Sequence, residues 1–74
     1  MNLQQLRYVI IVAKYGTFRE AARQLYMAQS SLSSSIKDLE EEYGIQIFER
    51  SKKGIEITKE GAMLLEFADQ IVAQ

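Results

Sequence analysis

Apolar residues recur at helical spacing through a serine-rich stretch in the middle of the chain, residues 29–43. Leu32, Ile36, Leu39 and Tyr43 follow one another at steps of four, three and four, which places them along one face of an α-helix. We expect that face to be buried. The opposite face carries short polar side chains and one cation, namely Ser30, Ser33, Ser34 and Lys37.

The five serines between residues 30 and 35 are unusual in a helix, because serine side chains compete for backbone hydrogen bonds. Short hydroxyls let a helix enter the major groove of DNA, where serine can bond to base edges and phosphates. The alternative is a serine-rich linker. A linker, however, has no reason to carry an apolar stripe at helical spacing. The stretch therefore predicts a recognition helix at about residues 29–43.

The same periodicity predicts two earlier helices. The first ends at Tyr15, before Gly16, and its apolar face is formed by Leu3, Leu6, Val9, Ile10 and Ala13. Thr17 and Glu20 have the spacing of a capping box, so the second helix begins at Phe18. Its inner face is formed by Phe18, Ala21, Ala22 and Leu25. Residues 26–28 are long enough only for a turn, so the second and third helices form a helix-turn-helix.

The period changes after Gly44, which is placed to end the third helix. Ile45 and Ile47, then Ile55 and Ile57, alternate with polar residues, and this alternation predicts two short β-strands joined by a basic loop at residues 51–54. A two-stranded hairpin is marginally stable alone, so we expect Phe48 to anchor it on the helices. The hairpin, at about residues 45–58, is a wing beside the helix-turn-helix.

A fourth helix is expected after Thr58, which is placed to cap it. The helix carries an apolar stripe predicted to mediate dimerisation, formed by Leu64, Leu65, Ala68, Ile71 and Val72. No stop signal follows, which suggests the front part of a longer protein. The expected fold is thus mostly α: a winged helix-turn-helix in residues 1–58, with a three-helix core and a short two-stranded wing, followed by the start of a linker or dimerisation helix in residues 59–74.

Composition narrows the possible functions. The 74 residues include no cysteine and no histidine, so disulfides and thiolate or imidazole metal sites are excluded, and we expect no cofactor. The run Glu40–Glu42 is interpreted as a solvated face rather than a catalytic site, because adjacent helical residues point about 100° apart. We expect no enzyme activity. No apolar run approaches the ~20 residues that cross a membrane, so the expected location is cytoplasmic.

Charge is segregated along the chain although the net charge is only −1. Residues 1–37 contain five basic residues and one acid, residues 38–49 five acids and no base, and residues 50–59 four bases and one acid. A domain with this distribution can place its basic side on phosphates and keep its acids away. The acidic pI, about 5.3, favours the alternative of a small helical protein–protein interaction domain that does not bind DNA.

Nearly the whole chain resembles the amino-terminal domain of the LysR-type transcriptional regulators. The positions that carry the resemblance are Leu6, Phe18-x-x-Ala21-Ala22-x-x-Leu25, Gln29, Leu32-Ser33, Ile36, Leu39-Glu40, Gly44, Ile47-Phe48-x-Arg50 and Ile57-Thr58-x-x-Gly61. The resemblance implies a winged helix-turn-helix that binds double-stranded promoter DNA as a homodimer or tetramer, with dimerisation through the fourth helix. It also implies a separate domain, absent here, for a small-molecule inducer.

The chain departs from the family pattern at three positions. Family members usually have Ser or Thr where Ala28 stands, Pro where Ser30 stands, and often Arg where Ser34 stands. The first two changes weaken the start of the recognition helix and leave capping to Gln29 or Ser30. The third removes an Arg, the residue that most often reads guanine, so the preferred DNA sequence should differ.

The residues expected to contact DNA are short polar or basic side chains of the helix-turn-helix and the wing. They are Thr17, Arg19, Gln29, Ser30, Ser31, Ser33, Ser34, Lys37, Arg50, Lys52 and Lys53. Gln29 suits a base edge, whereas Lys37 and the wing lysines suit phosphates. The alternative interpretations are a solvated loop for Lys52 and Lys53 and simple helix capping for Thr17.

Overall fold

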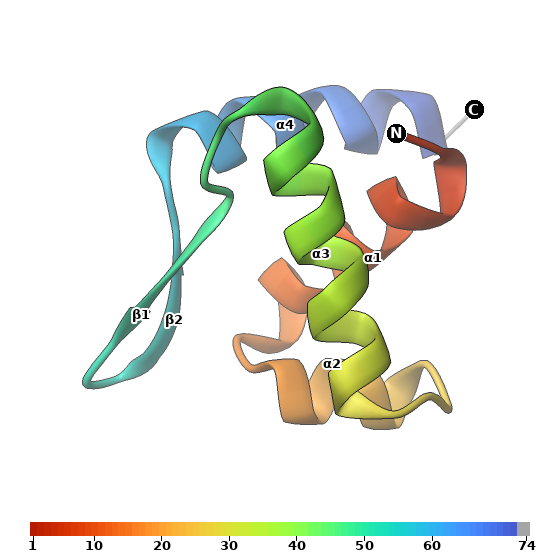
Figure 1. Ribbon diagram of the computed structural model, residues 1–74, viewed down its shortest axis with the longest axis vertical. Coiled ribbons are helices and arrows are strands. Elements are labelled where there is room, and N and C mark those ends of the chain that lie inside the picture. Colours follow the sequence, from red (N-terminus) through yellow and green to blue (C-terminus); the bar gives the residue numbers. More distant parts are fainter. Residues whose placement is uncertain (73–74) are drawn as a thin grey trace.

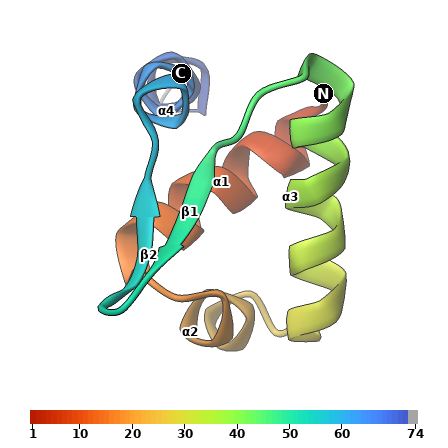
Figure 2. The same cartoon turned by 60° about the vertical axis from the view of Figure 1, so that its left-hand side comes forward.

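The computed structural model describes residues 1–72, with the backbone alone at Val72 (Figure 1). The elements follow in the order α1 (Leu3–Tyr15), α2 (Phe18–Gln24), α3 (Gln29–Tyr43), β1 (Phe48–Ser51), β2 (Gly54–Ile57) and α4 (Lys59–Val72). α4 lies at one end of the molecule, and both α3 and the hairpin run from it toward the end that holds α2 (Figures 1 and 2). The predicted winged helix-turn-helix is confirmed.

The core forms where the apolar faces of α1, α2 and α3 meet the base of the hairpin. Its buried residues are Val9, Val12, Ala21, Ala22, Leu32, Ile36, Leu39, Ile47 and Phe48. α2 buries Ala21 and Ala22, and their small side chains allow it to pack closely against its neighbours. Phe48 anchors the hairpin and meets the ring of Phe18 edge to face, with the ring centres 6.0 Å apart.

The predicted buried face of α3 needs one correction at its end. Leu32, Ile36 and Leu39 are buried, but Tyr43 is 52% exposed. The last turn of α3 extends past the core, so the Tyr43 ring instead borders an open apolar hollow of about 520 Å³ together with Ile45, Leu64 and Phe67. Gly44 then ends the helix with φ of 64°, a left-handed conformation that favours glycine.

The capping box predicted at Thr17 is only half formed. The Thr17 hydroxyl accepts from the Glu20 amide at 3.1 Å, but the Glu20 carboxylate accepts from Arg23 at 2.9 Å and from Gln24 at 3.3 Å instead. The guanidinium group nearby explains the difference, because a charge-assisted bond outcompetes a bond to a neutral amide. A complete capping box stands at the start of α1, where Asn2 and Gln5 bond each other's backbone amides.

The strand prediction is wrong at residues 45–47. β1 begins only at Phe48, β1 and β2 are antiparallel with Phe48 opposite Ile57, and Lys52 and Lys53 alone form the turn. The Ile47 amide donates to the Glu40 carboxylate at 2.7 Å and its carbonyl accepts from the Thr58 amide at 2.9 Å. The bond with Thr58 continues the register of the ladder, but the Ile47 amide donates to Glu40 on α3 instead, so the strand pairing begins only at Phe48.

α4 begins where Thr58 accepts from the Gly61 amide at 2.9 Å, which confirms the predicted cap. Its first turn lies against the hairpin base so closely that a Cβ added at Gly61 would stand 2.3 Å from the Ile47 carbonyl oxygen. Glycine is therefore required there by space. Among residues 1–72, no helix is long and apolar enough to span a membrane.

The apolar stripe predicted to mediate dimerisation is largely part of the chain's own core. Ala68 is fully buried, and Leu64 and Leu65 are half-buried against the core beside α1. The Val72 side chain lies outside the described residues. The outward face of α4 carries a different row, with Met63 67%, Phe67 52% and Ile71 39% exposed. Only Ile71 belongs to both sets.

Candidate nucleic-acid interface

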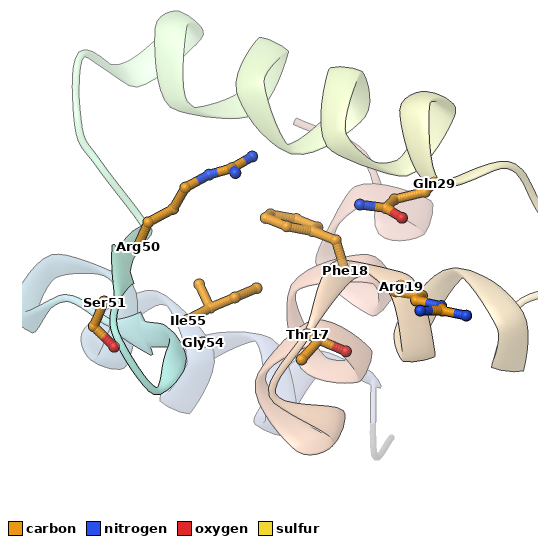
Figure 3. Close-up of a pocket in the computed structure, with 8 residues that line it drawn as sticks. All are labelled: Thr17, Phe18, Arg19, Gln29, Arg50, Ser51, Gly54 and Ile55. Atoms are coloured by element: carbon orange, nitrogen blue, oxygen red, sulfur yellow. The ribbon is translucent and has the colours of Figure 1, made fainter.

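A hollow of about 260 Å³ lies where the start of α2, the start of α3 and the wing come together. Its lining residues are Thr17, Phe18, Arg19, Gln29, Arg50, Ser51, Gly54 and Ile55 (Figure 3). Four of the predicted DNA-binding residues, from three separate elements, are thereby brought to one place: Thr17, Arg19, Gln29 and Arg50. The fold thus brings residues that are far apart in the sequence onto one surface.

Not all of the polar side chains around this hollow point into it. Figure 3 shows the guanidinium group of Arg50 reaching from β1 toward α3, and the amide of Gln29 entering the same space from the first turn of α3. The Phe18 ring lies between them, held by its contact with Phe48. Arg19 points away from the wing. A ligand beside α3 would thus meet Gln29 and Arg50 together.

A second hollow, of about 500 Å³, continues along α3 between this helix and the wing. Ser33, Lys37 and Glu40 line it from α3, and Phe48 and Arg50 line it from β1. Because Arg50 borders both hollows, they form one surface that runs along the wing-facing side of α3. Two cations and one acid line this part of the surface.

The serines divide between two sides of α3. Ser33 is half-buried and faces the wing, while Ser30 and Ser34 are exposed beside it. Ser31 lies about 160° around the helix axis from Gln29, on the flank away from the wing. The N-cap position is occupied by Ala28 and carries no side-chain cap bond, so the expectation that Gln29 or Ser30 takes over the capping is wrong.

The basic residues of this surface lack acidic partners. Among residues 1–72, ion pairs join Arg23 to Glu20 and the amino terminus to Glu42, and none involves Arg19, Lys37, Arg50, Lys52 or Lys53. The hydrogen bond from Arg23 lowers the pKa of Glu20, and Gln24 lowers it further. Lys52 and Lys53 are exposed at the wing tip, near the end of the molecule that holds α2 and the start of α3 (Figure 1). These cations are therefore free of ion pairs within the described residues.

Glu40 lines this surface but was not among the residues expected there. The expected solvated acidic face is wrong at this position, because Glu40 is half-buried and its carboxylate accepts from the amides of Ile47 and Phe48 at 2.7 and 3.3 Å. Two signals could have found it: Leu39-Glu40 belongs to the family pattern, and Glu40 stands four residues from Ile36 and three from Lys37, at the edge facing the wing. Because Glu40 belongs to a run of three glutamates, its separate environment was not recognised from the sequence.

Comparisons with known proteins agree with this geometry. Residues 3–62 match the family model described as bacterial regulatory helix-turn-helix protein, lysR family. The chain is 37% identical over 73 residues to the HTH-type transcriptional regulator TfdT of Cupriavidus pinatubonensis, covering 99% of this chain and 32% of that protein. It is 42% identical over 73 residues to the HTH-type transcriptional regulator BsdA of Bacillus subtilis, covering 97% of this chain and 25% of that protein.

A solved structure has the same fold. A crystal structure of the BenM DNA-binding domain in complex with catB site 1 DNA superposes with a TM-score of 0.94 at 38% identity. The match covers 99% of this chain and 82% of that one. The chain spans about a quarter to a third of the length of the curated relatives it matches.

Proposed function

Because the chain belongs to the LysR family of bacterial regulatory helix-turn-helix proteins, we propose that it is the sequence-specific DNA-binding domain of a transcriptional regulator. α3 enters the major groove of double-stranded promoter DNA, and the wing lies on the adjoining backbone or minor groove. A major groove about 12 Å wide admits an α-helix.

The observation that carries this proposal is the convergence of unpaired basic and amide side chains from α2, α3 and β1. Arg50 and Gln29 share one hollow, and Lys37 continues the same surface along α3. Half or more of protein–DNA hydrogen bonds go to phosphates and sugars, and they fix the register of the protein on the duplex. Arg19, Lys37, Arg50, Lys52 and Lys53 suit that role, as does the Thr17 hydroxyl.

Sequence readout falls to Gln29 and the serines. A glutamine can pair bidentately with adenine, whereas serine bonds to several base edges and selects weakly. The serines assigned to this face are Ser30, Ser33 and Ser34, while Ser31 reaches DNA only at the flank of the helix. Because Ser34 replaces the arginine frequent in the family, the preferred site depends less on guanine at that position.

We further assign residues 1–58 to DNA binding and residues 59–74 to the start of a linker and dimerisation helix. The support is the exposed apolar row of Met63, Phe67 and Ile71 on α4, beside the apolar hollow that Phe67 borders. A second copy packed on this row would relate two α3 helices by a two-fold axis. The DNA would then be an interrupted palindrome with half-sites about 34–36 Å apart.

The remainder of the regulator is proposed from the length of the relatives. An inducer would act through a domain outside this chain, and the assembled protein would be a homodimer or tetramer. It would work in the cytoplasm, where a bacterial regulator meets its promoters, and would catalyse no reaction. The described residues contain no cluster of His, Cys, Asp and Glu suited to a metal ion. The alternative of a DNA-independent interaction domain is supported by the acidic pI and by the α4 row, but the charge is segregated along the chain and a second copy accounts for the row.

Binding to promoter DNA across a salt series tests the DNA-binding function. Removal of one phosphate contact should reduce the slope of log K against log salt by about one. The Lys52→Ala, Lys53→Ala double variant should therefore have a slope smaller by about two. Lys59→Ala should leave the slope unchanged, because Lys59 is the first residue of α4 and α4 lies at the opposite end of the molecule from α2 (Figure 1). A wild-type chain with no salt-dependent binding at low salt would favour the interaction domain.

Two further variants separate readout from dimerisation. Gln29→Ala should cost about 1–3 kcal/mol on the preferred site and less on random DNA. Phe67→Glu should dissociate the dimer in sedimentation without unfolding the domain, because the Phe67 side chain is half exposed. Leu65→Glu is a poor test of dimerisation, since Leu65 packs on the core.

A further inference from the structure

The carboxylate of Glu40 connects α3 to the base of the wing. One oxygen, Oε2, accepts from the Ile47 amide at 2.7 Å and from the Phe48 amide at 3.3 Å. Phe48 is the first residue of β1, so these bonds fall at the point where the hairpin leaves the body of the domain. The backbone carbonyl of Glu40 also accepts from Gly44 and Ile45, which brings the chain around to this point.

The base of the wing is held from its other side by Thr58. The Thr58 hydroxyl donates to the carbonyls of Gln46 and Ile47, and the Thr58 amide donates to Ile47. Beyond this base the hairpin has four paired positions and a two-residue turn. Because a short two-stranded hairpin is marginally stable alone, its direction depends on how its base is held.

The negative charge of Glu40 does not explain why an acidic residue lies on this surface. Glu40 lines the same hollow as Lys37 and Arg50, on the surface proposed to face DNA phosphates. A carboxylate there repels phosphates, so its direct electrostatic effect on DNA binding is unfavourable. Its hydrogen bonds to the wing are the contribution that offsets this repulsion.

We propose that Glu40 is a positioning residue for DNA binding: it sets the direction of the wing relative to α3, so that Arg50, Lys52 and Lys53 reach the backbone while α3 lies in the groove. The inference rests on the proposed DNA-binding function. It assigns Glu40 no contact with DNA. Its effect is transmitted through the amides of Ile47 and Phe48.

The test is a double-mutant cycle read from the salt dependence of DNA binding. In the wild-type background, Lys52→Ala with Lys53→Ala lowers the slope by about two. In a Glu40→Ala background the slope has already fallen by that amount, and the same lysine changes then have little further effect. Glu41→Ala, on an exposed neighbour, is the matched control and leaves the lysine effect intact.

Two conservative variants distinguish position from charge. Glu40→Gln keeps an acceptor oxygen of the same reach, so it retains the wing contribution and binds DNA as well as or better than wild type. Glu40→Asp keeps the charge but is shorter by one methylene, so it loses the wing contribution and serves as the test variant if Glu40→Ala does not fold. In Glu40→Ala and Glu40→Asp, amide hydrogen exchange should be faster than in wild type at residues 47–57 and unchanged within α1 and α2.

Two kinds of failure can be told apart. Additive effects of Glu40 and the wing lysines, or a full slope in folded Glu40→Ala and Glu40→Asp chains, would overturn the inference while leaving the proposed function standing. A wild-type chain that does not bind DNA would overturn the proposed function and the inference together.

Discussion

The two ends of α3 are built in opposite ways. At its C-terminal end, Gly44 closes the helix, the Glu40 carbonyl accepts from two amides, and the Glu40 carboxylate accepts from two more. At its N-terminal end, Ala28 supplies no side-chain cap bond, and Gln29, Ser30 and Ser31 are exposed. One end is held by the fold, whereas the other is left open.

This difference shows how a small domain can divide one helix between stability and recognition. Backbone groups without partners at a helix end are satisfied by water or by a ligand. The open end of α3 lies beside α2, at the end of the molecule toward which the wing also points (Figure 2). The held end lies toward the opposite end of the molecule, the end that holds α4 (Figure 1). Substitutions at the two ends should therefore differ in their effects, and the most disruptive one is expected at the held end.

Gly61→Ala should disrupt the contact between α4 and the base of the wing, which lies next to the held end of α3. The added methyl would stand 2.3 Å from the Ile47 carbonyl oxygen, so α4 or the base of the wing must move. We expect the free energy of unfolding to fall by about 3 kcal/mol, at the upper end for overpacking, measured by chemical denaturation. Ala62→Gly, the reverse change at the exposed next position, should cost only about 1 kcal/mol through helix propensity. A stabilised Gly61→Ala chain would contradict the close approach.

Thr58→Ala should weaken the same end less. It removes the cap on the Gly61 amide and the bonds to the carbonyls of Gln46 and Ile47, so we expect a loss of about 2 kcal/mol in thermal or chemical unfolding. Thr58→Ser keeps the hydroxyl and should lose much less. Thr17→Ala removes only the single bond to Glu20 and should cost about 1 kcal/mol. Equal losses at positions 17 and 58 would show that only capping matters.

Ala28→Ser should close the open end. Ala28 already has the extended backbone of a cap residue, with φ of −70° and ψ of 141°, and lacks only the hydroxyl. We expect stability to rise by about 1 kcal/mol. Ala62→Ser, within an exposed helical turn where serine caps nothing, should instead lower stability slightly. If Ala28→Ser brings no gain, the first turn of α3 already has its partners.

Lowering the pH should remove a small stabilising contribution at the C-terminal end of α3. The hydrogen bond from the amino-terminal ammonium group lowers the pKa of Glu42 below its ordinary value of 4.5. A carboxyl whose pKa is lower in the folded state adds stability above its unfolded pKa, and this stability is lost as the pH falls through the folded pKa. Carboxyl-detected NMR titration should show the depressed pKa, and acetylation of Met1 should raise it again. A titration unchanged by acetylation would assign the shift to another group.

Local patterns were enough to predict most of the fold. The periods of apolar residues located all four helices, Gly16 and Gly44 marked two helix ends, and Thr17 and Thr58 marked two starts. These features depend on residues a few positions apart, and for such distances sequence spacing is nearly spatial spacing. The predicted DNA-binding residues followed largely from the family resemblance, and their contacts with DNA remain predictions.

The errors share a different cause. Ile45 and Ile47 alternate as a strand does, but the Ile47 amide donates to the Glu40 carboxylate on α3 and not to the other strand. On α4, two overlapping apolar rows satisfy the same spacing, and the position of α1 decides that Ala68 is buried while Phe67 is exposed. A pattern records that a side chain prefers burial, and it does not record which neighbour provides the burial.

The elements, their order and the family could thus be inferred from the amino-acid sequence, because periodicity, caps and motif spacing are properties of short segments. Three features became visible only in the folded chain: Gln29 and Arg50 share one hollow, Glu40 holds the base of the wing, and Gly61 must lack a side chain. Each of these depends on contacts between different elements. Such contacts arise from the whole core at once, so no single stretch of the chain encodes them.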